Sequence, residues 1–209
     1  ATYLFASDVV TQSGVPAGFP GDKAINSQVM RYGMNSSITS TYRSNVFNGL
    51  TNGIPTISIV TDLKNLFDKS NGIYVNASGN GRTWERPIML EQISPTNTAH
   101  EFSLPAGIRI RGAYSRGSSY PKHSFRFFFR NEYGASKLNF KLFDDEGADS
   151  FDKVDLRTAQ NYSWANGNGQ FTFIEECFSR DSQRDMGETY NRSRYYNLFI
   201  NGVYWGLYQ

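Results

Sequence analysis

Short segments in which apolar and polar residues alternate recur from residue 54 onward. Alternation of this kind, with many β-branched and aromatic side chains, predicts β-strands. The predicted strands are residues 55–61, 72–76, 84–93, 101–104, 107–111, 124–130, 138–143 and 153–158. Glycine, proline and asparagine separate most of them, which is typical of antiparallel meanders.

A further pair of strands, 195–200 and 203–208, surrounds Asn201-Gly202. This dipeptide is the strongest short-range signal of a two-residue β-hairpin. The sequence therefore predicts a hairpin close to the last residue given.

The strand at 124–130 is rich in phenylalanine. A period of two sends Phe125, Phe127 and Phe129 to one side, where we expect them to pack in the core. Phe128 points the other way, so we expect this strand to be central and covered on both faces.

One long helix is predicted over residues 173–186. Thr172 and Glu175 have the spacing of a capping box, and Gly187 follows as a C-terminal stop. Asp62 is expected to cap a short helical turn through residue 66, and weaker helical spacing occurs in residues 40–50. The predicted class is α+β, dominated by strands.

Residues 1–53 differ from the rest of the chain in composition and in hydrophobic pattern. Glycine, proline, serine and asparagine occur at short intervals, and apolar runs are short. We interpret this part as an extended lead-in or linker and expect a domain to occupy residues 54–209.

Composition and charge narrow the class of protein. The 209 residues are 39% hydrophobic and 19% charged, which is a globular composition. The net charge of +2 is too small to indicate nucleic acid as the main partner. No apolar run approaches the roughly 18 residues of a membrane span, and the single cysteine excludes an internal disulfide.

The segment 107–130 contains the residues that most suggest a binding site. Arg109 and Arg111 alternate with isoleucines, a turn rich in glycine and serine follows, and Lys122 comes just before the phenylalanine-rich strand. Backbone N–H groups in such a turn approach phosphate oxygens closely, and Lys or Arg adds a charge-assisted bond. The spacing does not fit a P-loop. Two interpretations stay open from spacing alone: an anion site, or an ordinary hairpin whose arginines face water.

Several ordered motifs resemble the spore-coat CotH kinase family, in the form common in large secreted bacterial proteins. They are PTISIVTDLKNLFDKSNGIYVN, AGIRIRGAYSRGSSYPKHSFRFFFRNEYGASKL, FDKVDLRTAQNYSW and RSRYYNLFINGVYWGLYQ. The resemblance implies an atypical, protein-kinase-like α+β fold that binds ATP with magnesium. It implies a transferase that phosphorylates Ser or Thr of protein substrates and that is secreted or at the cell surface.

Carried onto this chain, the resemblance implies a loop that covers the nucleotide and a lysine that binds phosphate, Lys122. Arg126 would be a second charge, and we expect Arg111 and Lys122 to converge on one anionic site. The implied nucleotide-binding residues are Arg111, Gly112, Ser115, Ser118, Ser119, Lys122 and Arg126. In a kinase the helix at 173–186 would orient the lysine, so either Glu175 or Glu176 could pair with Lys122. A glutamate that only caps the helix is the other interpretation.

The resemblance also implies what lies outside this sequence. In the family a second lobe supplies the catalytic and metal-binding aspartates, so we expect the fold to continue after Gln209 and further domains to belong to the same parent chain. No catalytic residue and no metal ligand is assigned here. The acids at 144–155 are expected to form a solvated turn, although a cation site is the alternative. The competing function is a non-catalytic, extracellular, β-rich module for adhesion or glycan binding.

Overall fold

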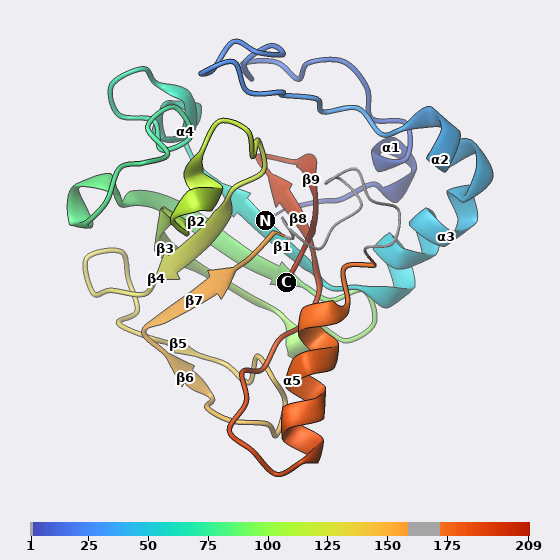
Figure 1. Ribbon diagram of the computed structural model, residues 1–209, viewed down its shortest axis with the longest axis vertical. Coiled ribbons are helices and arrows are strands. Elements are labelled where there is room, and N and C mark those ends of the chain that lie inside the picture. The colour runs from blue at the N-terminus through green and yellow to red at the C-terminus, as the bar shows by residue number, and fades with distance from the viewer. Residues whose placement is uncertain (1, 159–171) are drawn as a thin grey trace.

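A curled seven-stranded sheet forms the centre of the molecule (Figure 1). The computed structural model describes residues 2–158 and 172–209. The strands follow the order β7-β4-β3-β2-β1-β8-β9 across the sheet. Their bounds are β1 Thr56–Val60, β2 Arg86–Ile93, β3 Phe102–Arg111, β4 Ser124–Phe128, β7 Lys153–Leu156, β8 Tyr196–Ile200 and β9 Val203–Tyr208. This confirms the predicted strand-dominated α+β class.

The sheet consists of an antiparallel meander joined to a hairpin. Strands β1, β2, β3, β4 and β7 pair antiparallel in that order. The hairpin β8–β9 joins the meander through a parallel pairing of β8 with β1. Asn201 and Gly202 have φ of 48° and 79°, as a type I′ turn requires, so the predicted hairpin is confirmed.

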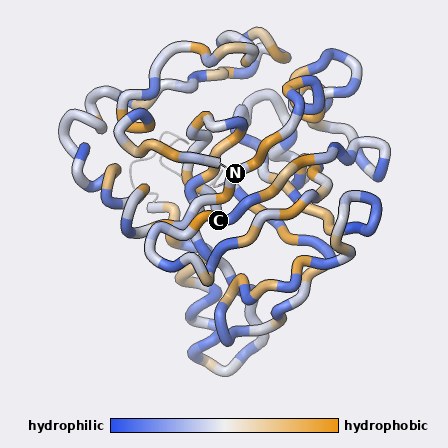
Figure 2. The backbone as a smooth tube through the Cα atoms, turned by 180° about the vertical axis from the view of Figure 1, so that it is seen from behind, coloured by the Kyte–Doolittle hydropathy of each residue, from blue (hydrophilic) through white to orange (hydrophobic). Residues whose placement is uncertain are grey.

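One face of the sheet is apolar and forms most of the core. Figure 2 shows hydrophobic segments concentrated in the central strands. Phe125, Phe127 and Phe129 are buried on this face, as predicted, and Ile108 and Ile110 of β3 lie beside the first two. Phe128 on the opposite face is also buried, which confirms that β4 is covered on both sides.

Some predicted strands differ from the structure. Residues 72–76 form turns, in which Ile73 and Tyr74 are buried without strand pairing. The two strands predicted at 101–104 and 107–111 are one continuous strand, β3, because β2 pairs with residues 102–108 across the predicted break and β4 pairs with residues 107–111. The strand predicted at 138–143 is reduced to β5, Leu138–Asn139, which pairs only with β6, Ser150–Phe151.

The helices lie at the periphery. They are α1 Ala6–Val9, α2 Ser36–Thr41, α3 Arg43–Asn48, α4 Leu63–Phe67 and α5 Glu175–Asp185, with single turns at Gly49–Gly53, Arg82–Trp84, Thr98–His100 and Tyr114–Arg116. Asp62 caps α4 by accepting from the N–H of Lys64 at 2.9 Å, as predicted. In the described part of the chain no helix has the length and apolar character needed to cross a bilayer.

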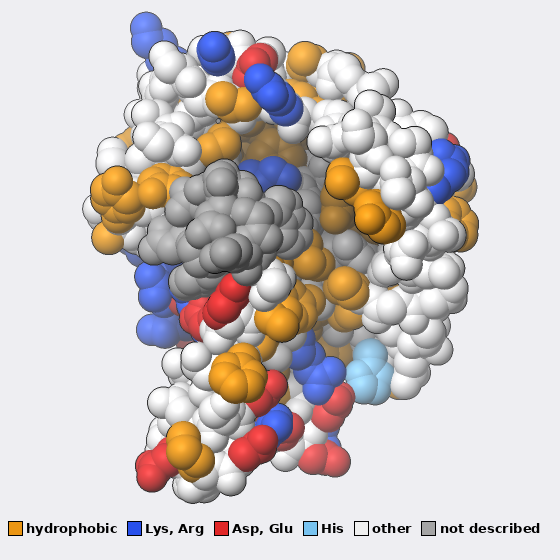
Figure 3. Space-filling view, turned by 45° about the vertical axis from the view of Figure 1, so that its right-hand side comes forward, with side chains coloured by type: hydrophobic (Ala, Val, Ile, Leu, Met, Phe, Trp, Pro, Cys, Tyr) orange, Lys and Arg blue, Asp and Glu red, His pale blue; other side chains and the backbone are white. Residues whose placement is uncertain are grey.

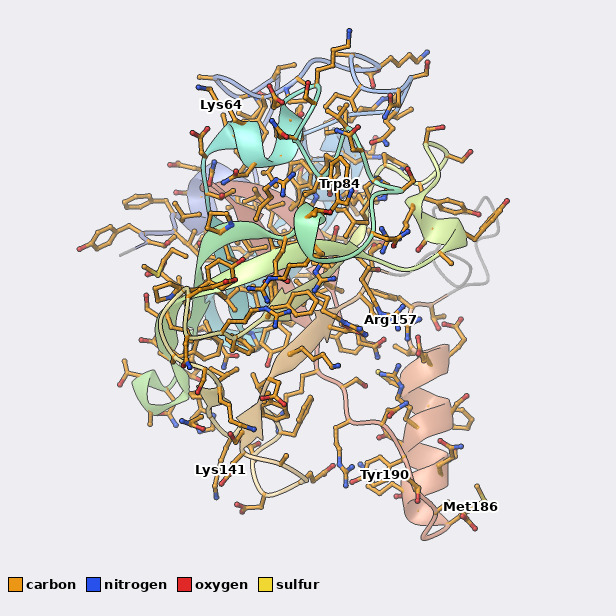
Figure 4. All side chains as sticks on the ribbon, turned by 90° about the vertical axis from the view of Figure 1, so that its left-hand side faces the viewer. Lys64, Trp84, Lys141, Arg157, Met186 and Tyr190 are labelled. Atoms are coloured by element: carbon orange, nitrogen blue, oxygen red, sulfur yellow. The ribbon has the colours of Figure 1, made fainter. Side chains whose placement is uncertain are left out.

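Helix α5 agrees with its predicted position and projects from the sheet (Figure 4, where Met186 marks its far end). Gly187, at φ 78°, donates to Arg184 O at 2.8 Å and ends the helix. Glu175 accepts from the N–H of Thr172 at 3.0 Å, which is one half of the predicted capping box. Phe178 is 72% exposed and no residue of α5 is buried.

The lead-in segment, residues 2–53, packs onto the rest of the molecule. Phe19, Met30 and Tyr32 belong to the same apolar core as the strands. The ring of Tyr32 lies 5.8 Å from that of Trp205 in β9, and 5.5 Å from that of Phe19. Residues from the first and last parts of the sequence therefore meet at the β9 end of the sheet.

Candidate functional site

The loop that joins β3 to β4, here called the serine loop (residues 112–119), is held in place by Arg116. Its guanidinium donates to Ile110 O at 2.7 Å and Gly112 O at 2.5 Å at the base of the loop. It also donates to Ala77 O at 2.9 Å and Gly79 O at 2.8 Å in the neighbouring turn. These four bonds attach the serine loop to a second segment, a role for Arg116 that the sequence analysis missed.

The glycine and serines of the loop have different roles. Gly112 has φ 114°, and a Cβ there would lie 1.9 Å from Ser115 Oγ, so only glycine fits. Ser115 accepts at its carbonyl from the ring of His123 at 3.1 Å. Ser118 and Ser119 lie at the exposed end of the loop.

Lys122 directs its ammonium group against β9. The residue is exposed along part of its side chain, but Nζ donates to the carbonyl of Trp205. Burial of this amine lowers the pKa of Lys122 to about 8. In the described residues the ammonium has no carboxylate partner, so its charge is balanced only by a backbone carbonyl.

A β-bulge in β9 creates the place for this ammonium. Leu198 pairs with Gly206 and Phe199 pairs with Tyr204, so Trp205 is an extra residue between them. Gly206 has φ 138°, and a Cβ on it would lie 2.7 Å from Lys122 Nζ. A glycine at this position therefore leaves room for the lysine.

His123 lies below the serine loop and is completely buried. Its ring is 5.0 Å from that of Tyr74, and Nε2 is 3.4 Å from Gln28 Nε2. Burial is the main reason that the pKa of His123 falls to about 4. The imidazole is therefore neutral at pH 7 and serves to support Ser115.

Arg111 and Arg126 lie on the other face of the sheet from Ile110, and both bind Asp155 of β7. Arg111 Nε is 2.8 Å from Asp155 Oδ2, and Arg126 Nη2 is 2.7 Å from the same oxygen. Burial raises the pKa of Asp155, but the hydrogen bonds from Arg126 and Arg111 outweigh it and the pKa lies below its ordinary value. Asp155 is thus an ionised partner of both arginines.

The predicted convergence of Arg111 and Lys122 is wrong in this structure. Arg111 lines a hollow of about 490 Å³ that also contains Asp155, while Lys122 lines a separate hollow of about 250 Å³. The side chains diverge because Arg111 continues the alternation of β3, whereas Lys122 precedes β4 and turns toward β9. The predicted nucleotide-binding residues therefore form two groups.

The same polar face carries a cluster that the sequence analysis missed. The carboxylate of Glu85 is buried and accepts from Arg109 Nε at 2.9 Å, Arg130 Nε at 2.8 Å and Tyr133 OH at 3.1 Å. The guanidinium groups of Arg109 and Arg130 also lie over the ring of Phe128, at 3.9 and 4.9 Å. This cluster fixes the face of the sheet opposite the core.

Neither glutamate of α5 reaches Lys122. Glu176 pairs with Arg157 and Arg180, and Glu175 accepts from Thr172 at the start of the helix. Figure 4 shows Arg157 beside the first turn of α5. Of the two interpretations left open by the sequence, the structure supports the glutamate that caps the helix and not the pairing with Lys122, because both acids are held where the helix begins.

The acids at 144–155 are dispersed among basic partners. Asp145 pairs with Lys141 at 2.8 Å, Asp152 pairs with Lys137 at 3.1 Å, and Asp144 pairs with Arg194. Figure 3 shows acidic and basic side chains mixed around the lower part of the molecule. Among the described residues, no group of three His, Cys, Asp or Glu side chains comes together as metal ligands would.

A comparison with known protein families gives one match. Residues 108–209 match the family model described as CotH kinase protein, a range that contains the serine loop, Lys122, α5 and the β8–β9 hairpin. No curated protein matches the chain, and no solved structure matches it. The match supports a kinase-like domain and gives no support to an adhesion or glycan-binding module. The match therefore supports a CotH-like domain over residues 108–209.

Proposed function

We propose that this chain is the nucleotide-binding part of a CotH-like atypical protein kinase, which transfers phosphate from ATP to Ser or Thr of protein substrates. The observation that carries the proposal is the ammonium group of Lys122. It lies beside a hollow of about 250 Å³, next to Gly206, and no described carboxylate neutralises it. A lysine placed in this way gains most from a phosphate, because an anion replaces a neutral carbonyl as its partner.

The residues present fit the phosphate part of ATP. The serine loop is exposed at Ser118 and Ser119 and joined to the same β3–β4 connection as Lys122. Arg116 holds the base of this loop through backbone carbonyls, so the loop is ordered before any ligand arrives. Order in advance lowers the entropy that binding must overcome.

The metal needs other residues. Phosphoryl transfer uses carboxylates to hold magnesium beside the phosphates. Asp155 and Glu85 are each held by two arginines, so neither is available for a cation. We propose that the magnesium ligands and the catalytic aspartate belong to residues outside the described part of the chain, in a second lobe.

The wider setting follows from the same proposal. Residues 54–209 would form the CotH-like unit, with the lead-in packed against it and further domains in the parent protein. The substrates would be Ser- or Thr-containing proteins, and the site of action would be the exterior of a bacterial cell or its spore coat. A kinase-like arrangement of the strands, with the serine loop above the nucleotide, is part of the proposal.

Binding of ATP tests the proposal directly. Isothermal titration with ATP, in magnesium and in EDTA, should show weak binding that Lys122→Met reduces at least about tenfold, since a charge-assisted hydrogen bond contributes about 1.5–3 kcal/mol. Lys64→Met is the matched control, because Lys64 is an exposed lysine on α4 (Figure 4). Equal binding by the wild type and Lys122→Met would contradict the proposal.

Phosphate transfer is the second measurement. The full-length parent protein should incorporate labelled phosphate from ATP into a Ser-containing protein, and Lys122→Met should abolish most of it. Full activity of that variant would remove Lys122 from the site.

A further inference from the structure

The hollow beside Lys122 contains a second cation, Arg31, which comes from the lead-in segment. The hollow is lined by residues 29–34 of the lead-in, by Pro121 and Lys122, and by Tyr204 and Trp205 of β9. Arg31 and Lys122 are the only charged residues among them, and both are positive. Two residues that are 91 positions apart in the sequence thus line one hollow, both basic, and none of the lining residues is acidic.

The backbone around Arg31 is held on both sides. Met30 and Tyr32 are buried in the core, so the alternation of this extended segment turns Arg31 to the outside. The N–H of Met30 donates to Asp22 Oδ1 at 2.9 Å. The hydroxyl of Tyr32 donates to Pro20 O at 2.8 Å. Arg31 is therefore exposed on a rigid support.

Gln12 connects this support to β9. Its side-chain amide accepts from the N–H of Tyr204 at 2.9 Å and donates to Tyr204 O at 3.1 Å. The same amide donates to Tyr32 O at 2.5 Å, directly after Arg31. Because β9 is the edge strand of the sheet, Gln12 occupies the place of a neighbouring strand. The two walls of the hollow are thereby fixed to each other.

Neither cation has an ionic partner among the residues that the structure describes. Lys122 donates to a carbonyl, and Arg31 takes part in no described hydrogen bond or ion pair. An anion bound in the hollow would be attracted by both basic residues. Two cations with an aromatic and apolar wall, from Tyr204 and Met34, suit an anion attached to an organic group.

We propose that Arg31 and Lys122 together bind the phosphate chain of a nucleoside triphosphate, so that the lead-in segment supplies half of the phosphate site. The identification of the ligand as a nucleoside triphosphate rests on the proposed function. The expectation that the ligand is an anion rests on the two basic residues that line the hollow. Arg31 is a binding residue in it, since its guanidinium presents several N–H donors to phosphate oxygens.

Titration with inorganic tripolyphosphate, and separately with ATP, tests the inference on the 209-residue chain. Arg31→Met and Lys122→Met should each weaken binding of tripolyphosphate about tenfold or more, and Arg31→Lys should weaken it less. Arg43→Met is the control, because Arg43 is an exposed arginine of the same segment that lines a different hollow. Circular dichroism of each variant establishes that it is folded.

The outcomes separate the two proposals. The role of Arg31 is refuted if Arg31→Met binds tripolyphosphate as tightly as the wild type does. It is also refuted if Arg43→Met loses as much affinity for tripolyphosphate as Arg31→Met does, even where Lys122 is required. If the wild type binds no tripolyphosphate at millimolar concentration, the anion site itself is refuted. If tripolyphosphate binds through both cations but ATP does not, the site stands and the kinase proposal fails.

Discussion

Replacing Glu85 by glutamine tests whether the polar face of the sheet is stabilised by one buried carboxylate. The side chain of Glu85 is 1% exposed and accepts hydrogen bonds from two arginines and a tyrosine. Glutamine has the same shape, but it has no charge and turns an N–H₂ group toward donors. The substitution therefore leaves Arg109 and Arg130 without their anion while the packing stays nearly constant.

The size of the effect follows from the exposure of the partners. Removing one member of a fully buried ion pair costs about 3–5 kcal/mol. Arg109 is 20% exposed and Arg130 is 32% exposed, so water recovers part of their solvation. We expect Glu85→Gln to lower the free energy of unfolding by about 2–3 kcal/mol at pH 7, which is roughly 4–12 °C in Tm at 2–4 °C per kcal/mol.

The pH dependence of the stability loss shows whether the negative charge of Glu85 causes it. Burial raises the pKa of Glu85, but hydrogen bonds from Arg130, Arg109 and Tyr133 outweigh it, so the folded pKa lies below the ordinary 4.5. A lowered folded pKa means that the stabilisation is complete above pH 4.5 and is lost as the pH falls through the folded pKa. The difference between the wild type and Glu85→Gln should therefore shrink toward pH 3.

Urea unfolding at pH 7, 5 and 3, followed by circular dichroism, measures these differences. Glu132→Gln is the control, because its pair with Arg82 is about half exposed at both ends and contributes less than about 1 kcal/mol. If Glu85→Gln were no less stable than Glu132→Gln, or if its loss were the same at every pH, the reasoning about the buried carboxylate would be refuted.

Three further predictions concern the candidate site and the hairpin. Gly206→Ala should destabilise the fold by about 1–3 kcal/mol in urea unfolding, since alanine is strained at φ 138°, and it should weaken ATP binding by displacing Lys122; unchanged affinity would contradict the role of the bulge. Arg116→Met should speed hydrogen exchange of the serine loop, because it removes two hydrogen bonds to the base of the loop and two to the neighbouring turn; protection equal to the wild type would show that the loop is held otherwise. Gly202→Ala should cost about 1 kcal/mol at the type I′ turn, measured against Gly21→Ala, which meets no neighbouring atom.

The parts of the fold that the sequence predicts well are those set by local pattern. The alternating phenylalanines of β4 point as expected, because a strand has only two faces and one of them is the core. The Asn201-Gly202 turn was also predictable, since few dipeptides tolerate positive φ at both positions. Helix α5 agrees in its bounds because Gly187 ends it through its own conformation.

The parts that the sequence predicts poorly depend on distant partners. Residues 72–76 alternate like a strand, but they form turns in which the N–H groups of Ile73 and Tyr74 donate to Asn65 O and Leu66 O, beside α4. The continuity of β3 depends on its pairing with β2 across residues 102–108, which no local signal reports. The role of Arg116 was hidden because its four acceptors are backbone carbonyls, which every residue has.

The direction of Lys122 shows why the candidate site could be predicted only in part. Motif resemblance selects the lysine, and alternation alone would place it on the side of Arg111. The structure turns it toward β9, because the bulge at Trp205 presents a carbonyl and Gly206 leaves space beside it. The bulge is a property of strand register, which depends on the pairing of β8 with β9 and not on the residues near Lys122.

The longest-range contacts of the chain therefore determine the electrostatics of the site. Gln12 and Tyr204 are 192 residues apart, and their hydrogen bonds bring the lead-in to the edge strand that also receives Lys122. Arg31 lines the hollow beside Lys122 because of this arrangement. Contacts of this separation form late if folding begins with local structure. The anion site should then be complete only in the fully folded chain, so that a phosphate ligand stabilises the lead-in, β9 and the strands between them as one unit.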